Sequence, residues 1–392
     1  GPRQGAGARA RGILMPEITP VPLSQLTTLR VGGTPQRTVE ARTTDELVDA
    51  LRDVWSTGER WLVLGGGSNL LFGDDEFDGT VILVRTTGIE RLPSPTPGHV
   101  RLKVQAGHSW DDLVAQTVAA GLSGIEAMAG IPGTTGAAPI QNVGAYGQEI
   151  VETLVEVELI DEATGDVSVV PASDLGLGLR TSVLKKHYGS VPERSAVILS
   201  VTLELAQVGH GAVPVRGAQL RSALGLDADA AVPLAWIRET VLEIRARKGM
   251  VLDEDDHDTW SAGSFFQNPV VSAQFAATLP AEAPRWSMAP EPEADRVIPL
   301  DQFTGFVPPR VGGPAPVKIS AAWLIEQAGM RKGFRLPGSQ ASLSTKHALA
   351  LTNRGRATAE EVAALARLIQ QRVQSEFGVL LQPEPVLFDV EL

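Results

Sequence analysis

A chain of 392 residues is too long for one ordinary hydrophobic core, so we expect two or three packed domains. Hydrophobic residues make up 43% and charged residues 20%, which is typical of a soluble globular protein. Because there is no cysteine, disulfide bonds and thiolate metal sites are excluded. The 46 acidic residues outnumber the 34 lysines and arginines, and a net charge of -12 argues against nucleic-acid binding.

Residues 1–15 are expected to lie outside the folded domains, as a tag or disordered N-terminus. They are rich in Gly, Ala and Arg and lack the apolar stretch of a secretory signal. Gly1 and Pro2 are typical of a pair left by tag removal, and Met15 is the candidate natural start. No apolar run reaches the roughly 18 to 20 residues that cross a bilayer. We therefore expect a cytoplasmic protein that binds neither membrane nor nucleic acid.

The first structured stretch mixes helix and strand signals. Thr44 is expected to cap a helix whose apolar residues recur at helical spacing. Short apolar runs at 61–64 and 81–84, bounded by Gly and Asp, predict buried strands. An alternating strand is expected at 101–106, followed by an amphipathic helix from Trp110 to Val118.

The later elements follow the same two patterns. Pro233 suits the start of a helix over 234–247, and Ser320 is expected to cap a helix over 321–328. Thr358 and Glu361 predict a capping box for the last helix, which ends at Gly378. The expected strands of the middle region are 154–160, 167–170 and 196–205. The Pro-rich range 280–317 has few periodic apolar residues and is interpreted as a long surface insertion.

A glycine-rich turn directly follows the strand at 61–64. Residues 65–70 read Gly-Gly-Gly-Ser-Asn-Leu, and three glycines let backbone N–H groups approach phosphate oxygens closely. No Gly-Lys-Ser/Thr follows, so this is not a P-loop, and the Rossmann pattern is incomplete. A tight surface turn remains the alternative for this cluster taken alone.

A second cluster, residues 130–147, is almost uncharged and dense in glycine, alanine and side-chain amides. Such residues suit a wall pressed against a flat, polar ligand. Two cradles of this kind can hold the two ends of a large cofactor. A closely packed structural turn is the alternative.

These motifs resemble the FAD-binding signature of the UDP-N-acetylenolpyruvoylglucosamine reductase family. The resemblance spans about residues 19 to 391, in order, and rests on the segments 65–69, 131–147, 179–182, 262–269, 318–327 and 383–384. The residues that it assigns to FAD are Gly65, Gly66, Gly67, Ser68, Asn69, Leu70, Ile131, Pro132, Gly133, Thr134, Gly136, Ala137, Gln141, Asn142, Gly144, Ala145 and Tyr146.

The resemblance implies an α+β protein with the FAD-binding fold of the PCMH and vanillyl-alcohol oxidase kind. Two α+β FAD-binding subdomains are expected at 16–87 and 88–247. A substrate-binding α+β domain is expected at 248–392, including the 280–317 insertion and a C-terminal catalytic segment. We expect the chain to act as a monomer.

The implied reaction converts UDP-N-acetylglucosamine enolpyruvate to UDP-N-acetylmuramate, for peptidoglycan precursor synthesis. NADPH reduces FAD, and flavin N5 then gives hydride to C3 of the enolpyruvyl ether. Charge develops at C2 and its carboxylate, and it has to be stabilised and then protonated. The family's catalytic trio matches Arg180, Ser264 and Glu384.

Each of the three residue types suits its implied role. The guanidinium fork of Arg180 can grip the substrate carboxylate. Ser264, beside two phenylalanines, can donate a proton to C2 in a dry site. Glu384, inside an apolar run, has a raised pKa if buried and can stabilise the C2 intermediate while protonated. Read alone, they would be a surface arginine, a backbone-bonded serine and a strand-edge carboxylate.

Four further residues match family positions that contact the substrate or the nicotinamide nucleotide: Lys248, Asn268, Lys318 and Gln327. Taken singly, each would be a solvated surface residue. The acidic run 253–258 lacks the pattern of a calcium loop, and the histidines show no metal-ligand spacing, so no metal site is expected. Ser264 has no Gly-x-Ser-x-Gly context, which argues against hydrolase chemistry.

Two positions depart from the family pattern. Leu179 stands where the family often has tyrosine, and Gly217 takes the place of a substrate-covering tyrosine, which bears on substrate closure and NADPH affinity. Two rival interpretations remain: an oxidase of the same FAD-binding class, and a nucleotide-binding module that has lost catalysis. The oxidase would need neither the Gly-Ser-Phe-Phe motif nor the terminal Pro-Glu, and retention of the trio argues against the module.

Overall fold

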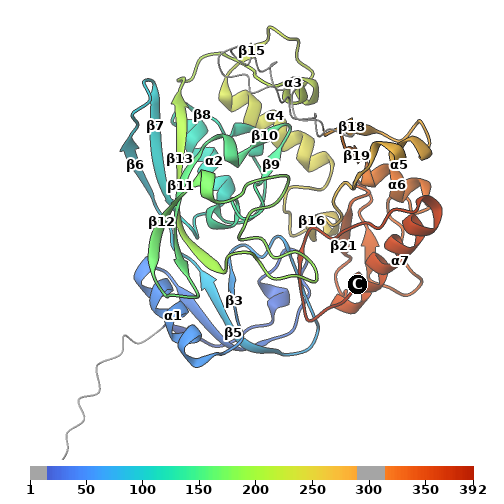
Figure 1. The fold of residues 1–392 in the computed structure, drawn as a ribbon, viewed down its shortest axis with the longest axis horizontal. Coiled ribbons are helices and arrows are strands. Elements are labelled where there is room, and N and C mark those ends of the chain that lie inside the picture. Colours follow the sequence, from blue (N-terminus) through green and yellow to red (C-terminus); the bar gives the residue numbers. More distant parts are fainter. Residues whose placement is uncertain (1–15, 289–313) are drawn as a thin grey trace, which may run out of the picture.

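Three groups of elements follow one another along the chain in the computed structural model, which describes residues 16–288 and 314–392. In Figure 1 the N-terminal group, in blue, lies below the middle group, in teal to yellow-green, and the orange and red C-terminal group lies beside them. Each group combines strands with helices, so the predicted α+β class is confirmed. The expected N-terminal tag, residues 1–15, lies outside the described residues.

The N-terminal group is built on a four-stranded sheet. In spatial order its strands are β1 (Glu17–Ile18), β2 (Pro35–Ala41), β5 (Phe77–Val84) and β3 (Trp61–Leu64). β5 is parallel to both β2 and β3. Val81 and Leu83 face one buried cluster while Ile82 and Val84 face another. A parallel strand buried on both faces reads as a continuous apolar run, which is why it was predictable.

Helix α1 (Thr44–Thr57) begins one residue earlier than predicted. Its cap is Thr43, whose side-chain oxygen accepts from the Glu46 N–H at 3.1 Å. The Thr44 hydroxyl instead donates to the Gln105 side chain at 2.9 Å. Both threonines are suitable caps, so the local sequence alone did not separate them.

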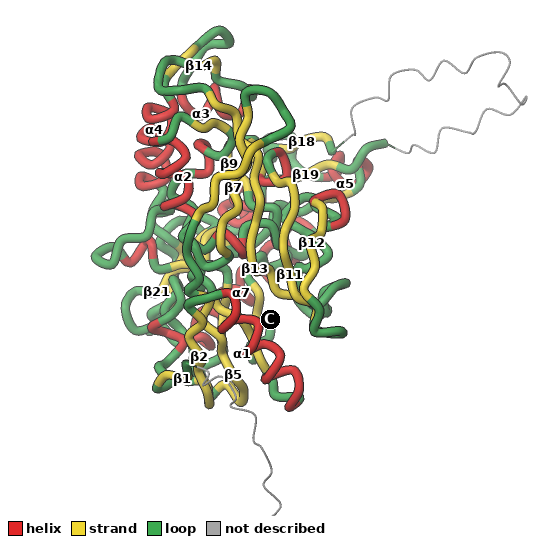
Figure 2. The backbone as a smooth tube through the Cα atoms, turned by 90° about the vertical axis from the view of Figure 1, so that its left-hand side faces the viewer, coloured by secondary structure: helices red, strands yellow, loops and turns green. Residues whose placement is uncertain are grey.

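The middle group is built on an antiparallel sheet whose strands lie side by side in Figure 2. In spatial order they are β12 (Val167–Pro171), β11 (Leu154–Asp161), β13 (Ala196–Gln207), β7 (His99–Gln105) and β6 (Ile89–Pro93), with β8 (Leu122–Ser123) also paired to β13. The predicted helices are α2 (Trp110–Ala119) and α4 (Leu234–Arg247). Smaller elements are β9 (Gly144–Ala145), β10 (Gln148–Glu149), β14 (Val213–Pro214), α3 (Ala218–Leu224) and β15 (Ala231–Val232).

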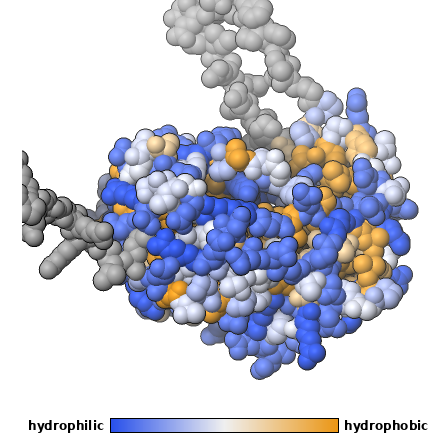
Figure 3. Space-filling model, turned by 90° about the horizontal axis from the view of Figure 1, so that it is seen from below, coloured by the Kyte–Doolittle hydropathy of each residue, from blue (hydrophilic) through white to orange (hydrophobic). Residues whose placement is uncertain are grey.

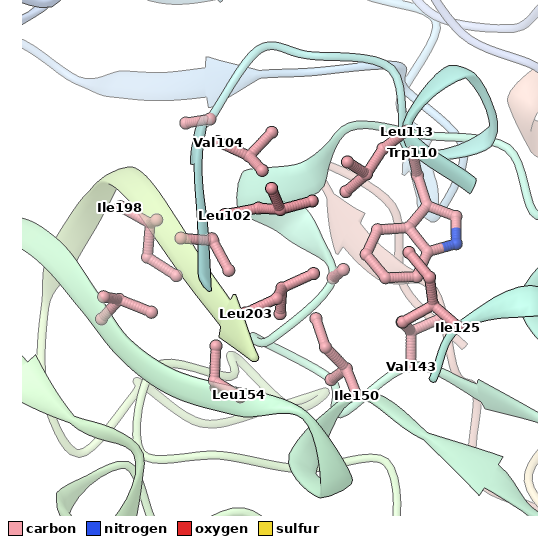
Figure 4. Packing of buried hydrophobic residues seen from close by; sticks show 14 of the residues in the cluster. Leu102, Val104, Trp110, Leu113, Ile125, Val143, Ile150, Leu154, Ile198 and Leu203 are labelled. Atoms are coloured by element: carbon pink, nitrogen blue, oxygen red, sulfur yellow. The ribbon is translucent and has the colours of Figure 1, made fainter. Parts of the chain in front are cut away.

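The largest core joins the middle group to one face of the N-terminal sheet. In Figure 4 the Trp110 ring lies among Leu113, Ile125 and Val143. Trp110 is fully buried, and its indole N–H donates to the Met128 carbonyl at 3.2 Å. Truncating such a buried tryptophan to alanine costs about 3–5 kcal/mol.

The described residues of the C-terminal group form two small sheets and three α-helices. One sheet has the order β16 (Ser261–Ser264), β21 (Ala350–Asn353), β20 (Ala341–Leu343), and the other β17 (Val270–Val271), β19 (Val317–Ile319), β18 (Arg285–Ser287). The helices are α5 (Ala273–Thr278), α6 (Ala321–Gln327) and α7 (Ala359–Phe377). The predicted capping box of α7 is present, with Thr358 and Glu361 each bonded to the other's backbone N–H.

The interpretation of 280–317 as a surface insertion throughout is wrong at its ends. Arg285–Ser287 pairs antiparallel with Val317–Ile319, so part of the range belongs to a sheet. A strand of three residues between prolines is too short to show the alternation on which strand prediction depends. The central residues 289–313 lie outside the described part of the chain.

The chain's last strand returns to the N-terminal group. β22 (Val386–Phe388) runs parallel to β4 (Leu70–Phe72), and the Phe72 and Phe388 rings stack 5.0 Å apart. This pairing brings the C-terminal segment beside the first glycine-rich turn.

On the face seen from below in Figure 3, hydrophilic residues predominate over small hydrophobic groups. Among the described helices, none combines the length and apolar character needed to span a bilayer.

Candidate active site

A cleft of about 480 Å³ is lined by residues from all three groups. The N-terminal and middle groups contribute residues of the segments 68–69, 131–132, 141–144 and 179–180, together with Arg245 of α4. The C-terminal group contributes residues of the segments 262–270 and 380–384, together with Lys318 and Leu349. Segments that are far apart in sequence therefore meet at one site.

The two glycine-rich clusters touch each other rather than lying at opposite ends of the site. A Cβ atom on Gly66 would lie 2.8 Å from the Gly133 Cα, closer than side chains tolerate. The Ser68 hydroxyl donates to the Pro132 carbonyl at 3.3 Å, and the Asn69 amide donates to the Gln141 side chain at 2.9 Å. Together they form a single wall.

This wall offers backbone donors suited to phosphate. Within the described residues, no hydrogen bond uses the backbone N–H groups of Gly66, Gly67, Ser68 or Asn69. Unused N–H groups in a turn form a concave anion-binding surface. The contact with Gly133 leaves no room for a side chain at Gly66, and the unused N–H groups make the wall suited to a cofactor that carries a diphosphate.

The predicted cofactor-binding residues divide into those that line the cleft and those that do not. The lining ones are Ser68, Asn69, Ile131, Pro132, Gln141 and Gly144. The others do not line it: Gly65, Gly66, Gly67, Leu70, Gly133, Thr134, Gly136, Ala137, Asn142, Ala145 and Tyr146. Asn142 is buried, and its side-chain amide donates to the Gly178 carbonyl at 2.9 Å. Its side chain thus holds the neighbouring turn, while Tyr146 packs against the core.

Arg180 stands at the tip of that turn, with a left-handed φ of 49°. Gly178 and Thr181 bridge across the turn's base. The guanidinium donates to the carbonyls of Asn142 and Gly144 at 3.1 and 3.0 Å, and to the Glu149 carboxylate at 3.2 Å. These bonds fix the side chain at the cleft wall. A guanidinium has more N–H donors than they use, so donors remain for a ligand.

Ser264 and Glu384 are brought together by antiparallel pairing of two distant segments. The Glu384 N–H donates to the Phe265 carbonyl at 2.8 Å, and the Gln267 N–H to the Gln382 carbonyl at 3.0 Å. Because proline has no backbone N–H, Glu384 is the only backbone donor in the sequence Pro383-Glu384-Pro385. Phe265 is buried and anchors the strand beside Ser264. Both predicted catalytic side chains line the cleft with Arg180.

The surroundings of Glu384 raise the pKa of its carboxyl group. Burial raises the pKa of its carboxyl, and the nearby charges of Arg180 and Lys185 oppose the shift. Lys185 is buried, and burial lowers the pKa of its ammonium group, opposed by Glu384. For both groups desolvation outweighs their mutual attraction. Sequence reasoning missed Lys185, because a Lys-Lys pair reads as solvated surface.

The four predicted substrate residues are only partly brought together. Asn268 and Lys318 line the cleft, whereas Lys248 and Gln327 are exposed and do not line it. The side-chain amide oxygen of Asn268 accepts from the Ala321 N–H at 2.9 Å at the start of α6.

Arg245 is a lining residue that sequence reasoning missed. Burial lowers the pKa of its guanidinium, and its buried Nε has no hydrogen-bond partner within the described residues. The sequence did contain one signal for this residue: Arg245 lies in the last turn of a predicted helix, three residues before the predicted substrate residue Lys248. A buried N–H without a partner is uncommon in a folded protein, which marks Arg245 as a residue of interest in the cleft lining.

The other sequence features have simple structural explanations. Asp258 of the acidic run accepts from the Thr345 N–H at 2.9 Å and from Arg354 at 2.7 Å, so it braces the C-terminal group. Leu179 is exposed and lines the cleft. Gly217 precedes α3 with a φ of 93°, a conformation that favours glycine.

Comparisons with known proteins agree with this geometry. The sequence pattern of the UDP-N-acetylenolpyruvoylglucosamine reductase C-terminal domain matches residues 255–388, and that of an FAD binding domain matches residues 35–170. A UDP-N-acetylenolpyruvoylglucosamine reductase of Leifsonia xyli subsp. xyli is 52% identical over 95% of this chain and 99% of its own length. One of Saccharopolyspora erythraea is 47% identical over 94% of this chain and 95% of its own.

A solved structure agrees as well. The crystal structure of a UDP-N-acetylenolpyruvylglucosamine reductase (MurB) from Thermus caldophilus matches with a TM-score of 0.59 and 26% identity. The match covers 96% of this chain and 100% of the other. The resemblance drawn from the motifs is confirmed: the chain belongs to the UDP-N-acetylenolpyruvoylglucosamine reductase family.

Proposed function

We propose that this chain reduces UDP-N-acetylglucosamine enolpyruvate to UDP-N-acetylmuramate with NADPH, as an FAD-dependent enzyme of peptidoglycan precursor synthesis. The observation that carries the proposal is the meeting of Arg180, Ser264 and Glu384 in one cleft beside the glycine-rich wall. Family membership supplies the reaction, and the cleft supplies the groups that the reaction needs.

Bound FAD would supply the hydride chemistry between NADPH and the enolpyruvyl carbon C3. The residues that would hold it are the wall residues, and the free N–H groups of Gly66 to Asn69 would be available to its diphosphate. The amide side chains of Asn69 and Gln141, which bond each other, add polar contacts at the cleft surface.

Arg180 holds the carboxylate of the substrate. Its guanidinium is fixed by two backbone carbonyls and Glu149, so little side-chain freedom is lost when a ligand binds. A cation held in a partly dry cleft stabilises the negative charge that develops at C2 and its carboxylate. The bonds to Glu149 and to the carbonyls keep its remaining donors in place.

Ser264 gives the proton to C2. Its hydroxyl makes no hydrogen bond within the described residues, so it is available to a substrate in the cleft. Glu384 stands in the same lining, and burial raises the pKa of its carboxyl. In its protonated form it can donate a hydrogen bond to the developing charge without adding a negative charge of its own. A protonated carboxyl is therefore the useful form.

A turnover assay tests the proposal. Purified protein should be yellow, bleach with NADPH under anaerobic conditions, and regain its colour when the UDP-sugar enolpyruvate is added. Flavin that bleaches but reoxidises only with oxygen would support the rival oxidase. Colourless protein that cannot be reconstituted with FAD would support the inactive module. A cytoplasmic location and a monomeric state stay predictions.

A further inference from the structure

Ser264 is presented to the cleft by an irregular strand. The register of β16 against β21 shifts between Ser261 and Ser264, where β16 carries one residue more than its partner strand. Gly263 lies in this β-bulge with a left-handed φ of 73°, a conformation that favours glycine. A bulge beside an active site re-aims a side chain. The direction of the Ser264 hydroxyl therefore depends on how this short segment is held.

Two hydrogen bonds hold the start of the bulge. The Ser261 hydroxyl accepts from the Gly263 N–H at 3.2 Å, so the bulge is closed from within. The Ser261 carbonyl accepts from the hydroxyl of Thr28 at 2.7 Å, across a sequence separation of 233 residues. The second bond comes from the N-terminal group, so β16 is fixed to a different group of elements at this point.

Thr28 also binds the first glycine-rich turn. Its backbone N–H donates to the Gly67 carbonyl at 3.0 Å. The two segments pack closely there, because a Cβ atom on Gly67 would lie 2.3 Å from the Leu26 carbonyl oxygen. Thr28 is 7% exposed and does not line the cleft. It thus connects the turn suited to a diphosphate with the strand that carries Ser264, while standing outside the cleft lining.

The residues after Thr28 are held by the neighbouring strand. The side-chain amide of Asn353, at the end of β21, donates to the carbonyls of Leu29 and Arg30 at 3.1 Å each. These bonds do not involve the Thr28 hydroxyl. They should keep the segment against the sheet when that hydroxyl is removed, so its loss is a local change.

We propose that Thr28 is a positioning residue of the proposed reaction, whose hydroxyl fixes the bulge that presents Ser264 relative to the first glycine-rich turn. This role rests on the proposed function and deepens it, because it names a residue outside the cleft on which proton delivery to C2 depends. A proton donor has to stand within reach of the atom that it protonates. A displacement of about 1 Å can cost about 10²-fold in rate.

The test compares Thr28→Val, Thr28→Ser and the control Thr27→Val in the FAD-loaded enzyme. Valine keeps the branched shape of threonine and removes the donor, whereas serine keeps the donor. Thr27 is equally buried, at 7% exposed, but its hydroxyl donates to the Val31 carbonyl of its own segment at 3.4 Å. Rapid mixing measures the two half-reactions separately, as flavin reduction by NADPH and flavin reoxidation by the UDP-sugar enolpyruvate.

Thr28→Val should slow reoxidation by about tenfold to a hundredfold, while flavin content, flavin reduction and substrate KM change little. The solvent deuterium isotope effect on reoxidation should rise, because proton delivery then limits the rate more strongly. Thr28→Ser should recover most of the rate, and Thr27→Val should match the wild type. Wild-type reoxidation in Thr28→Val would overturn the proposal. So would an equal slowing of both half-reactions, because the hydroxyl would then only support the fold.

A second readout does not depend on turnover. Amide hydrogen exchange in the 261–265 segment of the FAD-loaded protein should be faster in Thr28→Val than in the wild type or Thr27→Val, because the bond to Ser261 is lost. Equal exchange in all three proteins would also overturn the proposal. Wild-type protein that never reduces the UDP-sugar enolpyruvate would refute the proposed function, and the exchange comparison would still decide whether Thr28 holds β16.

Discussion

The ammonium nitrogen of Lys185 lies 3.1 Å from the carbonyl oxygen of Glu384, although 199 residues separate the two in sequence. This contact ties the turn that carries Arg180 to the C-terminal segment that carries Glu384. It also places the buried Lys185 cation beside the half-buried Glu384 carboxyl group, whose pKa it pulls downward against the effect of desolvation.

Removing that cation should move the pH profile of the enzyme. Because Glu384 acts protonated, its raised pKa means that activity is retained at low pH and lost as pH rises through that pKa. Lys185→Met should raise the pKa further and shift the alkaline loss of activity to higher pH. The measurement is the rate at which pre-reduced enzyme is reoxidised by substrate, across pH. Glu384→Gln should abolish the alkaline loss of activity. If Lys185→Met loses activity at the same pH as the wild type, the account is contradicted.

The contact between the glycine-rich clusters predicts a severe effect at Gly66. In Gly66→Ala the new Cβ would lie 2.8 Å from the Gly133 Cα. The contact is with backbone rather than with a flexible side chain, so neither segment can move aside easily. We expect lost FAD affinity and a lower melting temperature, measured by the flavin-to-protein absorbance ratio and by thermal unfolding. Gly211→Ala is the matched control, because a Cβ there meets nothing within 4 Å. Equal flavin content in both variants would refute the packed wall.

His347 predicts an acid-sensitive link to Ser264. Burial and the nearby charges of Lys248, Lys332 and Arg245 lower the pKa of His347 to about 4. Its Nδ1 accepts from the Leu349 N–H at 3.1 Å, and the Leu349 carbonyl accepts from Phe265, next to Ser264. The His347 Nδ1 can accept this hydrogen bond only while the imidazole ring is neutral, because both ring nitrogens carry a proton in the charged form.

The sign of the effect follows from proton binding. Between the ordinary histidine pKa of about 6.5 and the folded value of about 4, the unfolded chain binds a proton that the folded one does not. The free energy of unfolding should therefore fall as pH drops through this window. His347→Asn keeps a hydrogen-bond acceptor but does not titrate. Chemical denaturation should therefore show that its free energy of unfolding falls less than that of the wild type as the pH drops. The exposed His210→Asn should behave like wild type; the opposite ranking would contradict the account.

Much of the fold was predictable where one local pattern decided the structure. The apolar run at 81–84 became a strand buried on both faces, and Thr358 with Glu361 capped α7 as expected. The cap of α1 was wrong by one residue, because Gln105, distant in sequence, bonds Thr44. The strand at Arg285–Ser287 was missed because three residues carry no period.

The site was predictable from motifs only in its catalytic trio. Arg180, Ser264 and Glu384 stand in recognisable segments and do line one cleft. The residues that hold this trio in place do not stand in recognisable motifs. Glu149 fixes Arg180, and Lys185 donates to the backbone carbonyl of Glu384. Both read as solvated charges, because their partners are set by tertiary pairing rather than by neighbouring sequence.

The most direct test of the central claim separates the two half-reactions of Ser264→Ala. Reduction of the bound flavin by NADPH should stay near the wild-type rate, because the hydroxyl takes no part in it. Reoxidation by the UDP-sugar enolpyruvate should slow by about 10²–10⁴-fold, the usual contribution of a positioned proton donor. A variant whose reduced flavin is still rapidly reoxidised by that substrate would contradict the assignment of Ser264 as the proton donor.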